Sequence, residues 1–176
     1  SGGGAILTDS KALADHARKL AQQSREPVPW YEHKEVGYNY RMSNLLAAVG
    51  LAQLDKLPRI LAKRAENAAF YARHLPGRLL PTGNHWLSVA LFDSPEAARE
   101  LGARFAAANI ETRPVWKPLH LQPVFAHAPV YGGEVAESFF RRGLCLPSGT
   151  GLTARDRTRI RRVLDSFLQD RADATA

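Results

Sequence analysis

The sequence predicts an α/β fold, and three observations lead to this prediction. Short apolar runs of the length of strands occur at 85–92, 110–116 and 144–147. Segments with helical periodicity alternate with these runs, at 94–109, 135–143 and 153–170. The 176 residues are 45% hydrophobic and 23% charged, which is the composition of a globular protein with a sizeable core.

The helices of the second half carry recognisable signals at their ends. Ser94 is placed to cap the helix 94–109, with Pro95 in its first turn, and Gly143 is placed to end the helix before it. The closing helix has one apolar face, formed by Ile160, Val163, Leu164, Phe167 and Leu168. A small α/β domain is therefore expected in this half.

Helices are also expected in the first half. Asp9 or Ser10 can cap a helix over 11–24, Ser43 starts a second, and Pro58 opens a third. The segment 25–42 between the first two has no clean period and is rich in aromatic and charged residues. It predicts a long ordered loop, and loops of this length are often functional.

Composition and charge exclude several classes of protein. No apolar run approaches the roughly 20 residues of a membrane helix, so no membrane association is expected. The single cysteine, Cys145, lies between leucines; it is expected to be buried, and it fits a reducing, cytoplasmic compartment. The net charge of +7 favours anionic partners. The arginines of 154–162 lie opposite the apolar face, as on any solvated helix, and no nucleic-acid partner is expected.

The loop contains an excess of hydrogen-bond donors and flat rings. Tyr31, His33, Tyr38, Asn39, Tyr40 and Arg41 fall within a dozen positions. Asparagine supplies an amide donor, and arginine supplies a planar fork suited to phosphate oxygens. Each tyrosine taken singly is better explained by packing that pins the loop to the core, but the cluster as a whole indicates ligand contact.

A second candidate segment is ETRPVWKPLHLQPVF, where Arg113, Lys117 and His120 lie among prolines that stiffen the backbone. Three cations on such a segment suit an anionic ligand, although an exposed basic loop is the competing explanation. His120 and His127 lack a third ligand at useful spacing, so no metal site is expected.

The chain begins SGGGAILTD, and the residues alone do not explain its glycines. A phosphate-binding loop needs a preceding strand and a Gly-Lys-Ser/Thr ending, and this segment has neither. Taken alone, the segment is typical of a tag remnant.

Five motifs in this order give the chain a recognisable likeness: SGGGAILTD, YEHKEVGYNYRMSNLLAAVGLAQLDKL, NHWLSVAL, IETRPVWKPLHLQPVF and RGLCLPSGTGLT. The chain resembles the DegT/DnrJ/StrS family of pyridoxal-phosphate-dependent nucleotide-sugar aminotransferases over its whole length. NHWLSVAL, ETRPVWKPLH and CLPSGT resemble more narrowly the bacillosamine-type branch, which aminates a UDP-linked 4-keto-6-deoxy sugar.

The resemblance implies the carboxy-terminal part of a fold-type I transferase, active as a homodimer. Residues 1–57 would be the end of the large cofactor-binding domain with a dimer-interface loop. Residues 58–81 would be a linking helix and loop, and 82–176 the small α/β domain. Because part of the large domain would be missing, the chain is expected to form a dimer or higher oligomer that covers the apolar surface of 1–57.

The resemblance also implies roles for individual residues. Asn39 and Arg41 would reach across the dimer interface to the cofactor phosphate and the substrate diphosphate. Lys117 and His120 match a segment near the sugar nucleotide. The remaining substrate-pocket neighbours would be Tyr31, His33 and Trp86, with purely structural roles as the alternative.

In the family, a triple glycine like Gly2-Gly3-Gly4 follows shortly after the lysine that forms the Schiff base with pyridoxal phosphate. The chain starts downstream of that position, so no catalytic residue is expected in it, and Lys11, Lys19 and Lys34 do not match the family lysine. Because that lysine both holds the cofactor and moves the proton, this part alone is expected to be inactive and to bind no cofactor.

The implied function is thus part of an aminotransferase that moves an amino group, from glutamate, to a UDP-linked 4-keto-6-deoxy sugar. The alternative is a non-catalytic module that binds a nucleotide sugar or a partner protein with the same surface. Saturable binding of a UDP-sugar without cofactor would favour the module.

Overall fold

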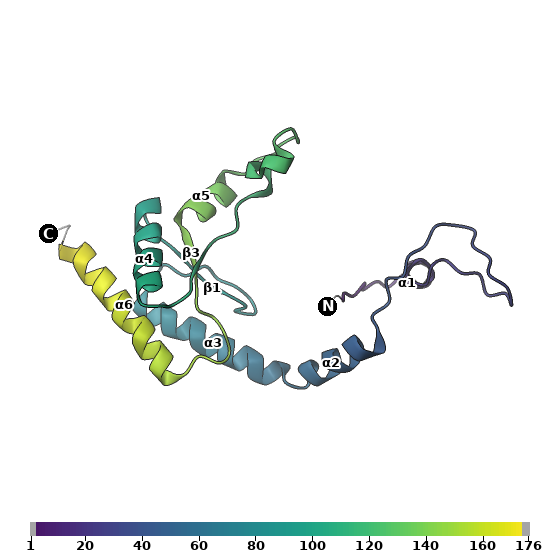
Figure 1. The fold of residues 1–176 in the computed structure, drawn as a ribbon, viewed down its shortest axis with the longest axis horizontal. Coiled ribbons are helices and arrows are strands. Elements are labelled where there is room, and N and C mark those ends of the chain that lie inside the picture. Colours follow the sequence, from purple (N-terminus) through teal and green to yellow (C-terminus); the bar gives the residue numbers. More distant parts are fainter. Residues whose placement is uncertain (1–2, 174–176) are drawn as a thin grey trace. The chain divides into compact units, whose positions relative to one another are not determined.

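The computed structural model describes residues 3–173, so Gly2 of the triple glycine lies outside the described residues. The chain divides into two compact units, Ser1–Leu57 and Pro58–Ala176, which are described separately below (Figure 1). Within the described residues, no helix has the length and apolar character needed to cross a membrane.

The first unit contains two helices, α1 (Lys11–Ala21) and α2 (Asn44–Leu54). Each begins after a serine whose side chain accepts a hydrogen bond from a backbone N–H of the first turn, which has no partner within the helix. The Oγ of Ser10 accepts a hydrogen bond from the backbone N–H of Leu13, and the Oγ of Ser43 accepts one from Leu46, both at 3.3 Å. The predicted starts of both helices are therefore confirmed, with Ser10 rather than Asp9 as the cap.

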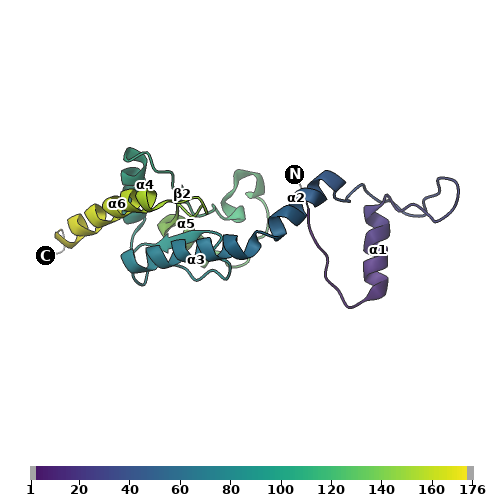
Figure 2. The same cartoon turned by 90° about the horizontal axis from the view of Figure 1, so that it is seen from below.

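The second unit contains four helices and a small sheet (Figures 1 and 2). Its elements are α3 (Leu57–His74, beginning at the boundary), β1 (Ser88–Leu91), α4 (Pro95–Ala107), β2 (Arg113–Pro114), α5 (Glu134–Arg142), β3 (Gly143–Leu146) and α6 (Ala154–Asp173). Two short 3₁₀ helices, η1 (Leu119–Leu121) and η2 (Pro123–Phe125), lie between β2 and α5.

The sheet has the order β1-β3-β2 and is antiparallel throughout. Val89 pairs with Cys145 in one ladder, and Arg113 pairs with Cys145 in the other. Since successive side chains of a strand point to opposite faces, Leu144 and Leu146 share one face and Cys145 lies on the other. Cys145 is a buried, free cysteine, as predicted, and burial raises the pKa of its thiol.

The hydrophobic core of the second unit lies between the sheet and three helices. Leu144 and Leu146 of β3 pack with the fully buried Leu101 and Phe105 of α4 and with a set from α3 and α6. That set is Phe70, Tyr71, Ile160, Leu164 and Phe167. The apolar face predicted for the closing helix is therefore confirmed, with Val163 and Leu168 partly buried at its edge. Residues 58–74, expected to link two domains, contribute directly to this core.

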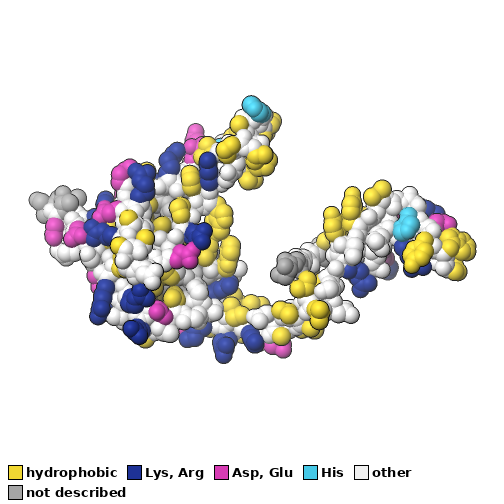
Figure 3. All heavy atoms as spheres, in the orientation of Figure 1, with side chains coloured by type: hydrophobic (Ala, Val, Ile, Leu, Met, Phe, Trp, Pro, Cys, Tyr) yellow, Lys and Arg dark blue, Asp and Glu magenta, His cyan; other side chains and the backbone are white. Residues whose placement is uncertain are grey.

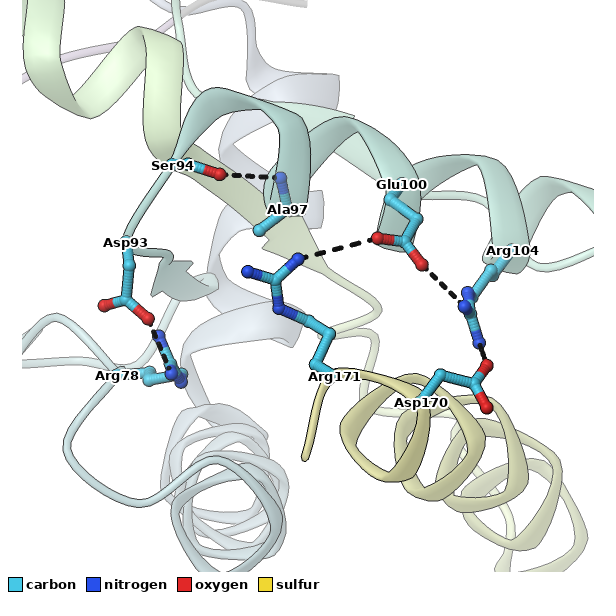
Figure 4. A network of polar contacts seen from close by, with 8 residues as sticks. All are labelled: Arg78, Asp93, Ser94, Ala97, Glu100, Arg104, Asp170 and Arg171. Atoms are coloured by element: carbon cyan, nitrogen blue, oxygen red, sulfur yellow. Dashed lines mark hydrogen bonds and ion pairs between the residues drawn. The ribbon is translucent and has the colours of Figure 1, made fainter. Parts of the chain in front are cut away.

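Polar contacts around α4 and α6 reinforce the core (Figure 4). Ser94 caps α4 by accepting a hydrogen bond from the N–H of Ala97 at 3.2 Å. Arg104 of α4 lies 2.6 Å from Asp170 of α6 and 2.5 Å from Glu100. Two further ion pairs join Arg171 to Glu100, at 3.6 Å, and Arg78 to Asp93, at 3.0 Å. These exposed pairs fix geometry more than they add stability.

Two of the strands, β1 and β2, are shorter than the apolar runs that predict them. The run 85–92 forms a strand only from Ser88, because residues 82–86 make a turn in which His85 has a φ of +49°. The run 110–116 forms only the two-residue strand β2. Trp86, next to this turn, and Trp116, two residues beyond the end of β2, therefore lie outside the ladders.

Candidate functional site

The predicted loop of the first unit is held as a distorted hairpin against the end of α1. Isolated antiparallel bridges join Gln22 to Asn39 and Arg25 to His33. The N–H of Tyr38 donates to the carbonyl of Leu20 at 2.8 Å, and the N–H of Tyr40 donates to that of Ala21 at 3.1 Å. The backbone that carries Asn39 is therefore in a fixed register with the helix end.

Gly37 allows the two arms of this hairpin to approach closely. A Cβ at this position would overlap the backbone nitrogen and the Oγ of Ser24 and the carbonyl carbon of Gln23. Ser24 is completely buried and, like Gln23, has a positive φ. Only a residue without a side chain fits opposite this turn.

Lys19 of α1 is the polar centre of the hairpin. Its Nζ lies 2.7 Å from a carboxylate oxygen of Glu26 and 3.1 Å from one of Glu35, so it joins both arms to the helix. The hydrogen bond to Glu26, followed by that to Glu35, raises the pKa of Lys19, and the same contact lowers the pKa of Glu26. Sequence reasoning missed this role, because seven and sixteen residues separate the partners along the chain.

Asn39 and Arg41 line the same cavity of the first unit. Its wall also includes Lys19, Gln22 and Arg25. Both predicted residues are exposed, and Arg41 has no ion-pair partner among residues 3–173. Glu26, the partner of Lys19, lies in the same wall, so the side chains left to donate hydrogen bonds to a phosphate group are the amide of Asn39 and the guanidinium of Arg41.

Tyr31 and His33 have partners within the loop itself. The guanidinium of Arg25 lies 4.5 Å from the ring centroid of Tyr31. The Nδ1 of His33 lies 2.8 Å from the carbonyl oxygen of Gln23 and must donate to it, because a carbonyl only accepts. Both contacts lie within the hairpin, and Tyr31 as a residue stays 81% exposed.

The second unit brings Trp86 together with a residue that sequence reasoning did not single out. The rings of Trp86 and Trp116 stack with centroids 5.7 Å apart and planes 30° apart. Thirty positions separate them along the chain. Both belong to segments predicted to lie near a ligand, and that was the only signal pointing to this pair.

Two of the three cations predicted for the second segment are neutralised locally. Arg113 donates to Glu111 at 2.6 and 2.8 Å. The Nε2 of His120 lies 3.1 Å from Oε1 of Glu137 of α5. The His120 ring also packs closely on Gly133, where an added Cβ would lie only 2.7 Å from Cε1 of the ring. Arg113 and His120 are therefore both engaged by carboxylates of this chain. Lys117 alone of the three is exposed without an ion pair among the described residues.

The contact between His120 and Glu137 makes the second unit sensitive to acid. The hydrogen bond from His120, followed by that from Arg141, holds the pKa of Glu137 below its ordinary value of 4.5. A lowered carboxyl pKa contributes stability above the ordinary value, and this contribution is lost as pH falls through the lower value. We expect the free energy of unfolding, measured in urea, to fall below about pH 4.5.

In Glu137→Gln, the decline of the unfolding free energy below about pH 4.5 should be smaller than in the wild type. Glu134→Gln is the matched control, since Glu134 occupies the same helical turn and forms no ion pair within the part of the chain that the structure describes. Identical pH profiles for wild type and Glu137→Gln would contradict the assignment.

A separate apolar groove lies between α4, β2 and α5. It has a volume of about 720 Å³ and is lined chiefly by small and apolar residues, among them Gly102, Ile110, Pro114, Phe140 and Leu144. None of the predicted site residues lines it. Its chemistry therefore differs from that of the polar loop.

Comparison with known proteins gives a consistent result. The profile of the DegT/DnrJ/EryC1/StrS aminotransferase family matches residues 1–165. The chain is 42% identical to the "Putative pyridoxal phosphate-dependent aminotransferase EpsN" of Bacillus subtilis (strain 168), over 93% of this chain and 46% of that protein. It is 35% identical to the GDP-perosamine synthase of Caulobacter vibrioides, over 94% of this chain and 48% of that protein.

A solved structure extends the likeness to the fold. The crystal structure of a DegT DnrJ EryC1 StrS aminotransferase from Brucella abortus matches with a TM-score of 0.78 and 28% identity, over 91% of this chain and 44% of that one. The predicted fold class, part of a fold-type I aminotransferase, is confirmed. The chain spans about half the length of the curated relatives it matches.

Proposed function

This chain belongs to the DegT/DnrJ/EryC1/StrS aminotransferase family, and we propose that it supplies the phosphate- and nucleotide-sugar-contacting part of a pyridoxal-phosphate-dependent sugar aminotransferase. The observation that carries the proposal is the cavity of the first unit, which the amide of Asn39 and the guanidinium of Arg41 line together. In the proposal, Asn39 and Arg41 hold the cofactor phosphate or the substrate diphosphate at an interface between two subunits.

The side chains around this cavity fit a phosphate group. The guanidinium of Arg41 offers two parallel N–H donors, and the amide of Asn39 offers a third direction of approach. When bound, pyridoxal phosphate supplies an electron sink that allows an amino group to be exchanged at a carbon. The role of this chain is to bind and orient the phosphate end.

Three of the four lysines of the first unit do not suit covalent attachment of the cofactor, and the fourth, Lys56, is exposed and does not line the cavity of Asn39 and Arg41. Attack on an aldehyde requires a neutral amine, and the two carboxylates around Lys19 favour its charged form. Lys11 pairs with Asp15, and Lys34 lies 4.0 Å from Glu32. We therefore propose that a lysine outside this sequence holds the cofactor and that the chain alone does not turn over.

We further propose a UDP-linked 4-keto-6-deoxy sugar as acceptor and glutamate as amino donor. The motifs NHWLSVAL, ETRPVWKPLH and CLPSGT support the UDP-sugar branch. The relative from Caulobacter is instead named as a synthase of a GDP-linked sugar. The experiment therefore compares UDP-linked and GDP-linked sugars.

The test is reconstitution. The chain is assayed with pyridoxal phosphate, glutamate and either nucleotide 4-keto sugar, alone and co-expressed with a polypeptide that matches the first half of the EpsN relative. We expect no turnover alone and turnover in the pair, with kcat/KM lowered at least about tenfold by Arg41→Ala, the loss of one charge-assisted contact. Lys56→Ala, an exposed residue of the same unit, is the control.

Two outcomes would contradict this proposal. Turnover by the chain alone, with a single reduced pyridoxyl-lysine after borohydride treatment, would show that the lysine is present. Saturable UDP-sugar binding without any turnover in the pair would indicate the non-catalytic module instead.

Self-association is the second part of the proposal. Helix α2 is apolar on all sides, and Leu45, Val49 and Leu51 are each at least 60% exposed within this chain (Figure 3). A helix that is hydrophobic all round is normally buried. We expect light scattering to give the mass of a dimer or higher oligomer, and Leu45→Ser/Val49→Ser to lower it, whereas Ala48→Ser should not. A monodisperse monomer would contradict this expectation.

A further inference from the structure

The stacked indoles of Trp86 and Trp116 are unusual because they are exposed. Their exposed fractions are 56% and 60%, although tryptophan is highly buried on average. The pair joins the segment before β1 to the segment after β2. Two large flat rings therefore face solvent at one place on the second unit.

The backbone on the Trp86 side is anchored. The N–H of Trp86 donates to the Oδ1 of Asn84 at 3.1 Å, within the turn that precedes β1. Two residues later, the N–H of Ser88 donates to the buried Oγ of Ser148 at 2.8 Å. The position of Trp86 is thus set from both sides.

The Trp116 side is equally constrained. The N–H of Val115 donates to the carbonyl of Gly143 at 3.4 Å, and the side chain of Val115 packs directly on that glycine. Pro114 and Pro118 flank the segment and restrict its φ angles. A platform whose rings are already placed loses little conformational entropy when it binds a flat ligand.

The charge beside the platform indicates what kind of flat ligand it suits. Lys117 follows Trp116, is exposed, and has no ion pair within residues 3–173, whereas Arg113 is occupied by Glu111. A flat ring joined to an anionic group would use both features. Nucleobases stack on exposed aromatic side chains irrespective of their hydrogen-bonding pattern.

We propose that Trp86 and Trp116 form the platform for the base of the nucleotide sugar, with Lys117 contacting its diphosphate. This assignment rests on the proposed function, which requires a nucleotide sugar but assigns no residues to its base. Binding by stacking tolerates uracil and guanine alike, and the chain is expected to bind both nucleoside diphosphates.

The chain offers a direct optical test because it contains three tryptophans. The third, Trp30, lies in the first unit and donates to Glu32 at 3.0 Å. In a Trp30→Phe background, all indole emission comes from the platform. UDP and GDP are titrated up to about 1 mM, the upper end of typical KM values of enzymes. Inorganic pyrophosphate is titrated as the probe that lacks a base.

We expect saturable quenching by UDP and GDP and none by pyrophosphate. Calorimetry should show the affinity for UDP falling about tenfold in Trp86→Leu and in Trp116→Leu, with Trp116→Phe recovering part of it. Lys117→Gln should weaken the binding of UDP more than the binding of uridine. Circular dichroism spectra of the variants should match that of the parent.

The proposal is overturned if the leucine variants bind UDP as the parent does, or if neither nucleoside diphosphate quenches the platform. It is also overturned if the variants change only the mass in light scattering, which would mark the pair as a protein contact. Turnover of the reconstituted pair is read separately. An unchanged KM for the nucleotide sugar in the leucine variants of this pair would contradict the platform proposal but not the proposed function.

Discussion

Replacement of Gly143 by alanine is expected to lower the free energy of unfolding of the second unit by about 3 kcal/mol. The new Cβ would overlap the carbonyl oxygen of Phe139 and Cγ2 of Val115, and would lie 3.2 Å from Cβ of Val115. The carbonyl belongs to the backbone of α5, and the valine is β-branched with few alternative rotamers. Neither obstacle can move without displacing the start of β3.

Gly102→Ala is the matched control for this substitution. A Cβ at position 102 would meet only Leu144 Cδ1, at 3.6 Å, and Thr112 Oγ1, at 3.8 Å. Because Gly102 lies inside α4, alanine there should be neutral or should stabilise by up to about 1 kcal/mol. Urea denaturation followed by circular dichroism measures both. Equal stability of Gly143→Ala and wild type would show that the packing at the α5–β3 junction is loose.

Replacement of Gly37 by alanine is expected to open the hairpin of the first unit. The added Cβ would overlap backbone atoms of Gln23 and Ser24, and the two arms would have to separate. The N–H groups of Tyr38 and Tyr40, which donate to Leu20 and Ala21, should then lose their partners. A local destabilisation of about 2 kcal/mol corresponds to hydrogen exchange about thirtyfold faster at these two amides.

Gly50→Ala serves as the control in the same unit, since a Cβ at that position in α2 would meet no atom within 4 Å apart from its chain neighbours and the backbone of its own helix. Exchange at Tyr38 and Tyr40 should be unchanged in this variant. Because Asn39 lies between the two amides, Gly37→Ala should also weaken phosphate contact in the reconstituted pair. Wild-type exchange rates in Gly37→Ala would show that the hairpin is not held by the approach at Ser24.

Features encoded by neighbouring residues could be predicted from the sequence. Serines placed one residue before periodic apolar segments mark the starts of α1, α2 and α4, because capping depends only on residues three positions apart. The apolar face of α6 follows from helical spacing in the same way. The family motifs predict the fold as a whole. A match to them assigns the chain the tertiary contacts of a known family, which no rule about neighbouring residues can provide.

Features that join distant residues could not be predicted. The role of Lys19 depends on a hairpin that returns Glu35 to α1, and the stack of Trp86 with Trp116 depends on the order of the strands. The hydrogen bond between His120 and Glu137 of α5, seventeen positions away, could not be predicted for the same reason. Charge counted along a segment says little about charge left exposed after folding.

The order β1-β3-β2 places the last strand of the chain at the centre of the sheet. Before residues 143–146 emerge from the ribosome, β2 has no partner strand and β1 has only the isolated bridge between Leu79 and Ala90, so both ladders of the sheet close later. Contacts between distant parts of a chain form slowly, and unpaired strand edges invite aggregation in the meantime. The second unit can therefore complete its sheet only after all of its helices and strands except α6 have been synthesised, and a polypeptide that stops short of Gly143 would lack both ladders.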